Sequence, residues 1–258
     1  MKQSIYILAY KPENYLCDVS QMNVLECGSD LHNDHFGDTL DNTGDNISLK
    51  NKYYVETTGI YWIWKNDNSD IKGHMQYRRF LSVNPYLIQK ILENNDIIFA
   101  NKAICPSTLI RTYMMDHNIN DLLDCEKIIK EDFKEYNDAF DNVIKFNNSM
   151  YYSNSFICKK ETYNDLCKFC FGVLEKYEQM HKFTCFEDIY EYEANYFKNF
   201  KYTQDFLQIY KGLHPELPDL NEYQSRVFGY LFERLINVYV VHNKLKIYEC
   251  GEYITNIV

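Results

Sequence analysis

The chain has 258 residues, 37 of them acidic and 27 basic, which gives a formal net charge of −10 at neutral pH. A surface with this excess of negative charge repels polyanions, so the composition argues against general nucleic-acid binding, and any bound phosphate needs a local basic site. The length suits a single large domain with a sizeable core.

The sequence has no recognisable export signal or membrane-spanning segment. The apolar run at the N-terminus is short and is closed by Lys11-Pro12, unlike a signal peptide, and the later run 235–242 is too short to span a bilayer. The nine cysteines are scattered without the spacing of disulfides or zinc sites, which suits free thiols in a reducing compartment. We therefore expect a cytoplasmic protein, with at most a peripheral attachment to the inner face of the membrane.

Strand and helix signals alternate in the first half of the chain. Short apolar runs predict buried strands at 4–9 and 23–27, and the polar residues from 28 to 52 predict a long surface loop. Residues 46–66 then show a helical spacing of apolar side chains, with Asn46 or Ser48 as the cap.

Further strands follow in this half. The stretch 73–81, GHMQYRRFL, reads as a half-buried strand, in which Tyr77 and Arg79 would point to one face and Arg78 to the other. Asn84-Pro85 are residues preferred at a helix start, and 96–100 is another buried strand. Strands that alternate with helices predict a mostly parallel sheet covered on both faces.

Helical patterns dominate after residue 107. They cover residues 108–117, 121–146 with a break, 161–181, 186–199 and 222–242. No linker or repeat divides the chain, so we expect one α/β domain over 1–258, with a nucleotide-binding core in 1–106 and a mainly helical part in 107–258. Ligands bind such sheets at the carboxyl ends of the strands, which places the loops after residues 9, 27, 80 and 100 around the site.

The adjacent arginines Arg78 and Arg79 are the strongest candidates for binding phosphate. The sequence is poor in glycine and has neither a dinucleotide fingerprint nor a P-loop, so side-chain cations or helix N-termini would have to meet a phosphate. An arginine is costly to bury without a partner, so each needs an anion nearby. The alternative, equally open, is that both form ion pairs with the protein's own carboxylates.

Three other groups of residues could carry binding or catalysis. The segment 40–51, LDNTGDNISLKN, could bind a sugar, a ribose or a cation, although a loop with an N-cap explains it as well. Glu233 lies in an apolar helical pattern, where it could act as a general base or, more often, hold an arginine such as Arg78 or Arg234. His32 and His35 lie among aspartates, but their spacing is not diagnostic of a metal site.

Taken together, several segments resemble a bacterial family that was first catalogued as a domain of unknown function. Its members are generally described as glycosyltransferases of capsular polysaccharide or exopolysaccharide biosynthesis. The similar segments occur in the family's order and cover nearly the whole chain: TGDNISLKN (43–51), ETTGIYWIWKN (56–66), GHMQYRRF (73–80), HNINDL (117–122), SNSFICKK (153–160) and RVFGYLFERLINVY (226–239). Several motifs in the right order are far more specific than any one of them.

The resemblance implies a glycosyltransferase A-type fold, a nucleotide-sugar donor linked to uridine diphosphate, and a glycan or lipid-linked oligosaccharide acceptor. Some relatives look like galactofuranosyltransferases. Where this fold ordinarily has an Asp-x-Asp that holds a metal on the diphosphate, this sequence has Gln76-Tyr77-Arg78-Arg79. The guanidinium groups could neutralise the diphosphate instead, so we expect no cofactor, with Mn²⁺ or Mg²⁺ as the open alternative.

The resemblance also implies a set of site residues. The expected donor contacts are Tyr10, Asp45, Asn46, Lys50, Tyr77, Arg78, Arg79 and Asn154. The family commonly has histidine where Tyr10 and Gln76 stand here, whereas Asn154 and Phe156 keep its pattern. Transfer with inversion needs a group that takes the proton of the acceptor hydroxyl, for which Glu233, Asp121 and His117 are the candidates.

Two other functions fit the same residues. One is a nucleotide-sugar hydrolase or phosphotransferase that uses the same donor pocket, which product analysis with and without an acceptor would reveal. The other is a non-catalytic glycan-binding or assembly protein that kept the fold, which would be favoured if the protein bound no nucleotide.

Overall fold

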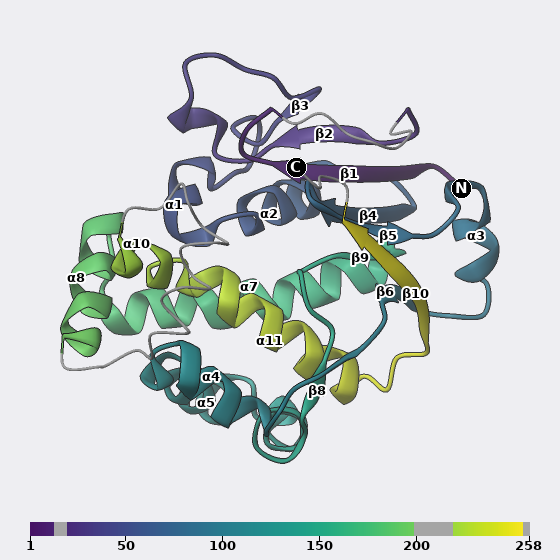
Figure 1. The fold of residues 1–258 in the computed structure, drawn as a ribbon. Coiled ribbons are helices and arrows are strands. Elements are labelled where there is room, and N and C mark those ends of the chain that lie inside the picture. The colour runs from purple at the N-terminus through teal and green to yellow at the C-terminus, as the bar shows by residue number, and fades with distance from the viewer. Residues whose placement is uncertain (13–19, 199–218, 255–258) are drawn as a thin grey trace.

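A computed structural model describes residues 1–12, 20–198 and 219–254 of the chain. Figure 1 shows a twisted sheet in the upper part of the molecule and a group of helices beneath it. The predicted α/β fold is therefore confirmed.

The strands form one large sheet and one small ribbon. Within the described residues the large sheet has eight strands: β1 (Gln3–Ala9), β2 (Asn23–Glu26), β3 (Thr39–Leu40), β4 (Ile71–Gln76), β5 (Arg79–Ser82), β6 (Ile97–Ala100), β9 (Phe156–Lys159) and β10 (Ile247–Ile254). The ribbon pairs β7 (Ala103–Ile104) with β8 (Ser149–Met150).

The large sheet is mixed rather than mostly parallel. Its hydrogen-bonded neighbours follow the order β3–β2–β1–β4–β9–β6–β10–β5, and Gln76 opposite Arg79 joins β5 back to β4. β1 to β4 are parallel to one another, and β10 is parallel to β6, whereas β9 and β5 run antiparallel to their partners. The prediction of a mostly parallel sheet was wrong because β9 and β10 come from the second half of the chain, where only helices were expected.

The helices divide into a first-half and a second-half group. The first group is α1 (Asn51–Tyr54), α2 (Thr57–Asn66) and α3 (Ile88–Ile91). The second is α4 (Leu109–Asp116), α5 (Ile119–Asp132), α6 (Asn137–Phe140), α7 (Lys160–His181), α8 (Phe186–Phe197), α10 (Leu220–Gln224) and α11 (Val227–His242). Short 3-10 turns occur at Ser29–Leu31, Ser48–Lys50, Pro85–Leu87 and Lys134–Tyr136, and a π-helix spans Asp141–Phe146.

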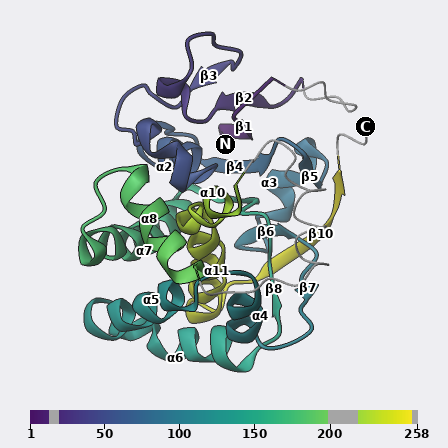
Figure 2. The same cartoon turned by 60° about the vertical axis from the view of Figure 1, so that its left-hand side comes forward.

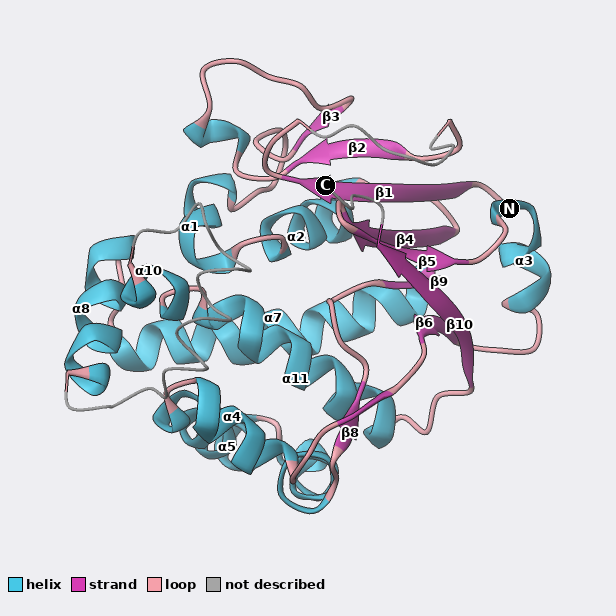
Figure 3. Cartoon of the chain, viewed as in Figure 1, coloured by secondary structure: helices cyan, strands magenta, loops and turns pink. Residues whose placement is uncertain are grey.

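The sheet is covered on both faces, as its alternating side chains require. Tyr6 and Leu8 of β1 belong to a large hydrophobic core shared with the long helices, whereas Ile5 and Ile7 belong to a smaller core that includes Ile88 of α3. Figure 3 shows α7 and α11 side by side on the helical side, and Figure 2 shows α4, α5 and α6 at the end of the molecule opposite β2 and β3.

The helical patterns predicted at 108–117, 121–146, 161–181 and 186–199 are confirmed by α4, α5, α7 and α8, with the expected break after Asp132. Residue 199 lies outside the described residues. The start at Asn84-Pro85 is also confirmed, because the Asn84 side chain accepts a hydrogen bond from the backbone N–H of Tyr86 at 3.0 Å. Among the described residues, no helix is long and apolar enough to cross a membrane.

Two predicted helices are interrupted. The pattern at 46–66 is divided between a 3-10 turn, α1 and α2, because the backbone of Val55 has a φ of 48° and leaves the helical conformation. The pattern at 222–242 is divided between α10 and α11 by Ser225 and Arg226. The predicted loop at 28–52 holds short elements only, namely β3 and two 3-10 turns, before α1 begins.

The stretch GHMQYRRFL is a hairpin rather than one strand. β4 ends at Gln76, Tyr77 and Arg78 form the turn, and Arg79 begins β5 directly opposite Gln76. The predicted alternation of Tyr77, Arg78 and Arg79 across two faces was therefore wrong. The turn places these residues at the carboxyl end of β4, where ligands of such sheets bind.

Candidate active site

The hairpin turn brings two aromatic rings and an arginine together at the carboxyl end of the sheet. β1 and β4 are parallel neighbours with Leu8 opposite Gln76, so the residues that follow them lie side by side. The rings of Tyr10 and Tyr77 meet edge to face with centroids 5.4 Å apart, and the guanidinium carbon of Arg78 lies 4.9 Å from the centroid of the Tyr77 ring. Three of the expected donor contacts thus form one partly exposed surface.

Arg79, on the other side of the turn, faces a carboxylate of β10. Its Nη1 lies 3.8 Å from Oε2 of Glu252, and about half of the Arg79 side chain is exposed. The other carboxylate oxygen of Glu252 accepts a 3.0 Å hydrogen bond from the hydroxyl of Ser153. The carboxylate that pairs with Arg79 is therefore Glu252 and not Glu233.

Glu56, which lies between α1 and α2, contacts the polar groups next to this turn. Its Oε1 accepts hydrogen bonds from the side-chain amides of Gln76 and Asn154, each 2.9 Å long. No residue in the described part of the chain donates a hydrogen bond to Oε2, and the side chain is partly exposed. One oxygen of this carboxylate is fixed, and the other is available to a ligand.

Glu233 of α11 uses both of its oxygens within the protein. Oε1 accepts from the backbone N–H of Ser153, and Oε2 accepts from the guanidinium of Arg234, each at 2.6 Å. Burial raises the pKa of Glu233, while Arg234 and the Ser153 N–H oppose this shift. The charges of Glu56 and Arg79 also act on Glu233, so the three groups are close in space.

The segment 153–155, which we call the corner, connects β8 to β9 and carries Asn154 to Glu56. Ser153 and Asn154 have φ values of 70° and 49°. His74 of β4 holds the corner, because its Nε2 donates to the carbonyl of Asn154 at 2.6 Å while its Nδ1 accepts from the hydroxyl of Tyr163 at 3.0 Å. Burial lowers the pKa of His74 to about 3, so the imidazole is neutral and can both donate and accept.

The backbone is also strained immediately before Glu56. Val55 combines a φ of 48° with a ψ of −133°, which is unfavourable for a β-branched residue. Gly229 of α11 makes room for it, since a Cβ at that position would lie 2.4 Å from Cγ2 of Val55. The Oδ1 atom of Asn154 is buried without a partner among the described residues. Strained backbone and unpaired polar atoms tend to cluster at functional sites.

His117 lies apart from this cluster, in the helical part of the molecule. Its Nδ1 is 3.0 Å from Oε1 of Gln224, and its ring stacks on Tyr230 with centroids 4.0 Å apart. Burial, together with the charge of Arg234, lowers the pKa of His117 to about 3. The structure places this residue among packed aromatic rings, where its described hydrogen bond goes to Gln224 and not to the hairpin turn.

Asp121 also lies in the helical part, paired with a second carboxyl group. Asp121 of α5 and Glu193 of α8 are both almost fully buried. The hydroxyl of Tyr177 donates to Oδ1 of Asp121 at 2.8 Å, and the two carboxyl groups are close enough to influence each other's pKa. Because burial raises the pKa of both groups, the pair retains a proton at neutral pH.

The described hydrogen bonds of Asp45, Asn46 and Lys50 go to residues other than Glu56, Gln76 and Asn154. Asp45 accepts a 3.1 Å hydrogen bond from the hydroxyl of Tyr61 on α2, and Asn46 accepts one of 3.2 Å from the N–H of Ser48 within its own turn. The ammonium of Lys50 lies 2.8 and 2.7 Å from the two carboxylate oxygens of Glu178 on α7, beside a hollow of about 360 Å³. Among the described contacts of these three residues, none reaches the hairpin turn.

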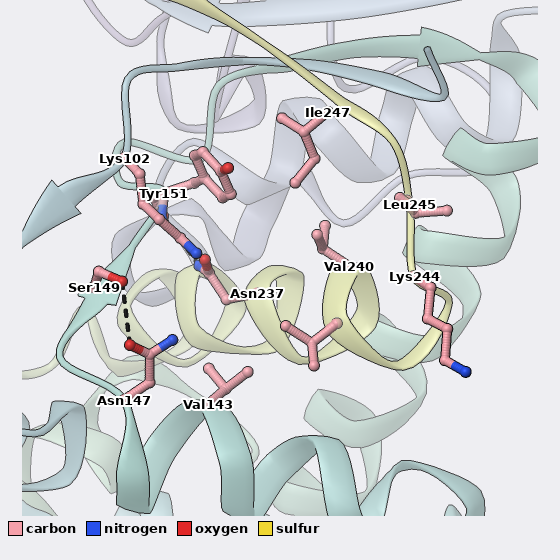
Figure 4. Close-up of a pocket in the computed structure, with 11 residues that line it drawn as sticks. Lys102, Val143, Asn147, Ser149, Tyr151, Asn237, Val240, Lys244, Leu245 and Ile247 are labelled. Atoms are coloured by element: carbon pink, nitrogen blue, oxygen red, sulfur yellow. Dashed lines mark hydrogen bonds between the residues drawn. The ribbon is translucent and has the colours of Figure 1, made fainter. Parts of the chain in front are cut away.

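A second hollow, of about 320 Å³, lies between α11, β8 and the start of β10. Figure 4 shows Lys102 and Lys244 on opposite sides of its apolar lining, and Asn237 directed toward Tyr151. The Asn237 amide accepts from the N–H of Tyr151 at 2.9 Å and donates to its carbonyl at 3.0 Å. Glu233 lies one helical turn before Asn237, so α11 holds the chain both before and at the corner.

The described residues contain no group of three or more His, Cys, Asp or Glu side chains that could hold a metal ion. His32 and His35 instead direct Nδ1 toward the same oxygen of Glu26, at 2.8 and 3.1 Å. The other Glu26 oxygen accepts from the backbone N–H groups of Phe36 and Gly37. These histidines therefore help to order the loop after β2.

A family model described as Domain of unknown function (DUF4422) matches residues 4–200 of the chain. The chain belongs to this family. The matched part of the DUF4422 domain includes Glu56, Gln76 and the hairpin turn, whereas Glu233 and Glu252 lie beyond it. No curated protein matches the chain.

The fold of this DUF4422 protein has a counterpart among solved structures. The apo structure of the WbbM bifunctional glycosyltransferase is similar to it, with a TM-score of 0.72 and 22% sequence identity. The similarity covers 99% of this chain and 46% of that chain, so the present chain spans about half the length of WbbM. At this level of identity the likeness shows a shared fold.

Sequence patterns missed several polar groups of the site in this DUF4422 chain, namely Glu56, Ser153 and Glu252. Glu56 was assigned to the interior of the helix predicted at 46–66. A weak signal was present, because Val55, Thr57 and Thr58 are β-branched and lower the helix propensity around it. Glu252 gave no signal, since β10 itself was not predicted.

Proposed function

We propose that this protein is a cytoplasmic glycosyltransferase that moves a sugar from a nucleotide-diphosphate donor to a hydroxyl group of a surface-glycan precursor. One observation carries the proposal: the turn with Arg78 and Arg79 follows Gln76, which is itself hydrogen-bonded to the carboxylate of Glu56. Cations that meet a diphosphate and carboxylates that can take a hydroxyl proton are the parts that sugar transfer needs. The fold shared with part of a bifunctional glycosyltransferase supports the proposal.

In this proposal the donor lies across the hairpin turn. The rings of Tyr10 and Tyr77 would pack against the nucleobase, for which uracil is the expected partner, and the guanidinium groups of Arg78 and Arg79 would contact the diphosphate in bidentate fashion. Asn154, whose amide donates to Glu56 beside the turn, would lie close to the sugar. Galactofuranose is one sugar to be tested, with a capsule, exopolysaccharide or lipopolysaccharide precursor as the acceptor.

We further propose that the transfer needs no metal ion. Two guanidinium groups at the turn can balance the charge that develops on the leaving diphosphate. Turnover of the purified protein should therefore persist in excess EDTA. Loss of activity in chelator and its recovery with Mn²⁺ or Mg²⁺ would overturn this part of the proposal.

Removal of the two arginines should weaken donor binding. Because a hydrogen bond to a charged group contributes about 1.5–3 kcal/mol, Arg78→Ala and Arg79→Ala should each raise the Kd of a uridine-diphosphate sugar about tenfold or more. Isothermal titration calorimetry measures this Kd directly. Arg111→Ala, which removes an exposed arginine of α4, is the matched control and should leave the Kd unchanged. Equal Kd values for all three variants would exclude the turn as the diphosphate site.

Product analysis distinguishes the proposal from its rivals. A transferase should release nucleotide diphosphate much faster when an acceptor is present and should form a glycosylated product. Release at the same rate without an acceptor would identify a nucleotide-sugar hydrolase. Failure of the wild-type protein to bind any nucleotide sugar would favour a glycan-binding or assembly role.

A further inference from the structure

Three carboxylates lie near the hairpin turn, and one of them, Glu252, is engaged by Arg79 and Ser153. The other two differ in what they can still bind. Glu233 has both oxygens engaged, one by the N–H of Ser153 and one by Arg234. Glu56 has one oxygen held by two amides, while its other oxygen meets no donor among the described residues and the side chain reaches the surface. Only the second arrangement leaves an oxygen that can approach a hydroxyl group of a ligand.

The other titratable groups considered for this role are already committed to internal contacts. Asp121 shares a proton with Glu193 in the helical part of the molecule. His117 hydrogen-bonds to Gln224 and stacks on the ring of Tyr230. Both ring nitrogens of His74 are hydrogen-bonded inside the core. None of these groups combines partial exposure with an available oxygen or nitrogen in the way that Glu56 does.

We propose that Glu56 is the general base of the reaction, an assignment that rests on the glycosyl transfer proposed above. The oxygen of the acceptor hydroxyl forms a bond to the anomeric carbon of the donor sugar, and its proton passes to Oε2 of Glu56. The bond between that carbon and the diphosphate oxygen breaks, and its electron pair leaves with the nucleotide diphosphate beside Arg78 and Arg79. A single displacement of this kind inverts the configuration at the anomeric carbon.

The surrounding residues hold Glu56 in place for this step. The amides of Gln76 and Asn154 fix Oε1, which leaves Oε2 without a donor among the described residues. Glu233 acts as a positioning residue, because its bond to the N–H of Ser153 holds the corner that carries Asn154. A base whose orientation is fixed before the substrate arrives needs no reorganisation during the reaction.

Glu56→Gln tests the assignment with little structural change. The Gln side-chain oxygen can still accept from Gln76 and Asn154, but the residue cannot take a proton. With uridine-diphosphate sugars as donors and a panel of octyl glycosides as acceptors, kcat should fall about 10²–10⁴-fold. The Kd of the donor and the thermal midpoint should stay close to those of the wild type. The acidic limb of the pH–rate profile, where the base is protonated, should disappear.

Two further variants separate catalysis from structure. Glu233→Gln should lower the thermal midpoint because it weakens the contact with Arg234, yet it should keep the acidic limb of the profile. Glu56→Ala should be inactive but regain part of its turnover in added formate, which can take the proton from the vacant position. Glu175→Gln, on the exposed side of α7, is the matched control for loss of one carboxylate.

The outcomes identify which proposal fails. If the wild-type protein transfers sugar and Glu56→Gln keeps full turnover, the assignment of Glu56 is wrong while the proposed function stands. A glycosidic product with retained configuration would also overturn the assignment. If the wild-type protein forms no glycosidic product with any donor and acceptor, the proposed function is wrong, and the role of Glu56 is wrong with it.

Discussion

Val55 has a backbone conformation that its surroundings must stabilise. A positive φ in such a residue costs on the order of 1–3 kcal/mol. Its carbonyl accepts hydrogen bonds from the Asn51 amide at 2.7 Å and the Thr58 hydroxyl at 3.2 Å, and the absence of a side chain at Gly229 leaves space for its own side chain. These contacts fix the direction in which the next residue, Glu56, leaves the backbone.

Gly229→Ala should therefore disturb catalysis through Val55. The added methyl group would lie 2.4 Å from Cγ2 of Val55, so the residue before Glu56 must shift. We expect kcat to fall about tenfold or more and stability to fall by about 1–3 kcal/mol, as for other overpacked positions. Steady-state kinetics and urea unfolding measure the two effects. Gly172→Ala in α7, where a Cβ would meet only the Phe133 ring at 3.0 Å, is the control and should keep its kcat.

The role of single residues was only partly predictable from sequence. The arginine pair stood out because adjacent arginines are unusual in a strand, and the structure does place Arg78 over the ring of Tyr77, which in turn contacts Tyr10. The turn itself gave no signal, since Tyr77-Arg78 lacks the Gly, Asn or Asp that marks most two-residue hairpins. Neither residue has a positive φ here, so neither needs to be one of those types.

At the scale of elements, a carboxyl group of α5 and one of α8 are buried together and retain a proton between them. Asp121 of α5 and Glu193 of α8 lie together in a buried site that also includes Asp124, and Tyr177 of α7 donates to Asp121. Two ionised carboxylates in this position would repel each other at low dielectric. The packing of α8 on the bundle therefore depends on the pair remaining protonated.

This proton makes the stability of the fold dependent on pH. Burial raises the pKa of Asp121 to about 8, far above its value in an unfolded chain, so between about pH 4 and pH 8 the folded state holds a proton that the unfolded state releases. The contribution to stability is complete below pH 4 and is lost as the pH rises through this range. The contribution of this pair to the free energy of unfolding should therefore fall from pH 5 to pH 8, while the buried His74 and His117, with pKa values of about 3, add stability as the pH rises toward 6.5.

Asp121→Asn should make that dependence shallower. The amide stays neutral at every pH and can keep the hydrogen bond from Tyr177 through Oδ1. Relative to the wild type, the variant should gain at least about 1 kcal/mol between pH 5 and pH 8, since one unit of pKa corresponds to about 1.4 kcal/mol. Urea unfolding at the two pH values measures this gain. An identical difference from the wild type at both values would contradict a shared proton.

Elements with a strong local pattern were the predictable ones. α4, α5, α7 and α8 follow from the 3.6-residue spacing of their apolar side chains, which one face of a helix must show to pack. The break before α2 was missed because it depends on Gly229, far away in the sequence. β9 has only four residues, and β10 mixes polar residues and a glycine, so neither carries a strand signal of its own.

At the scale of the whole molecule, strands from both halves of the chain are interleaved in one sheet. β9 lies between β4 and β6, and β10 lies between β6 and β5. Register pairs such as Gly251 with Ser82 join residues far apart in the sequence. The part after residue 106 is mainly helical, but the sheet is incomplete without its strands.

Removal of β10 should therefore unfold more than the end of the chain. A stop codon after Lys246 would leave the edges of β5 and β6 unpaired and remove Glu252, the partner of Arg79. We expect the truncated protein to lose cooperative thermal unfolding and to aggregate. Circular dichroism during heating tests this, and a wild-type transition in the truncated protein would show that β10 is dispensable.

The position of β10 also bears on how the protein is made. The ribosome makes the chain from its N-terminus, so β5 and β6 leave the exit tunnel well before β10, the strand that pairs with both of them. During that time two open strand edges are exposed to other chains in the cell. The unpaired edges of β5 and β6 should therefore need a holding chaperone until β10 has left the exit tunnel.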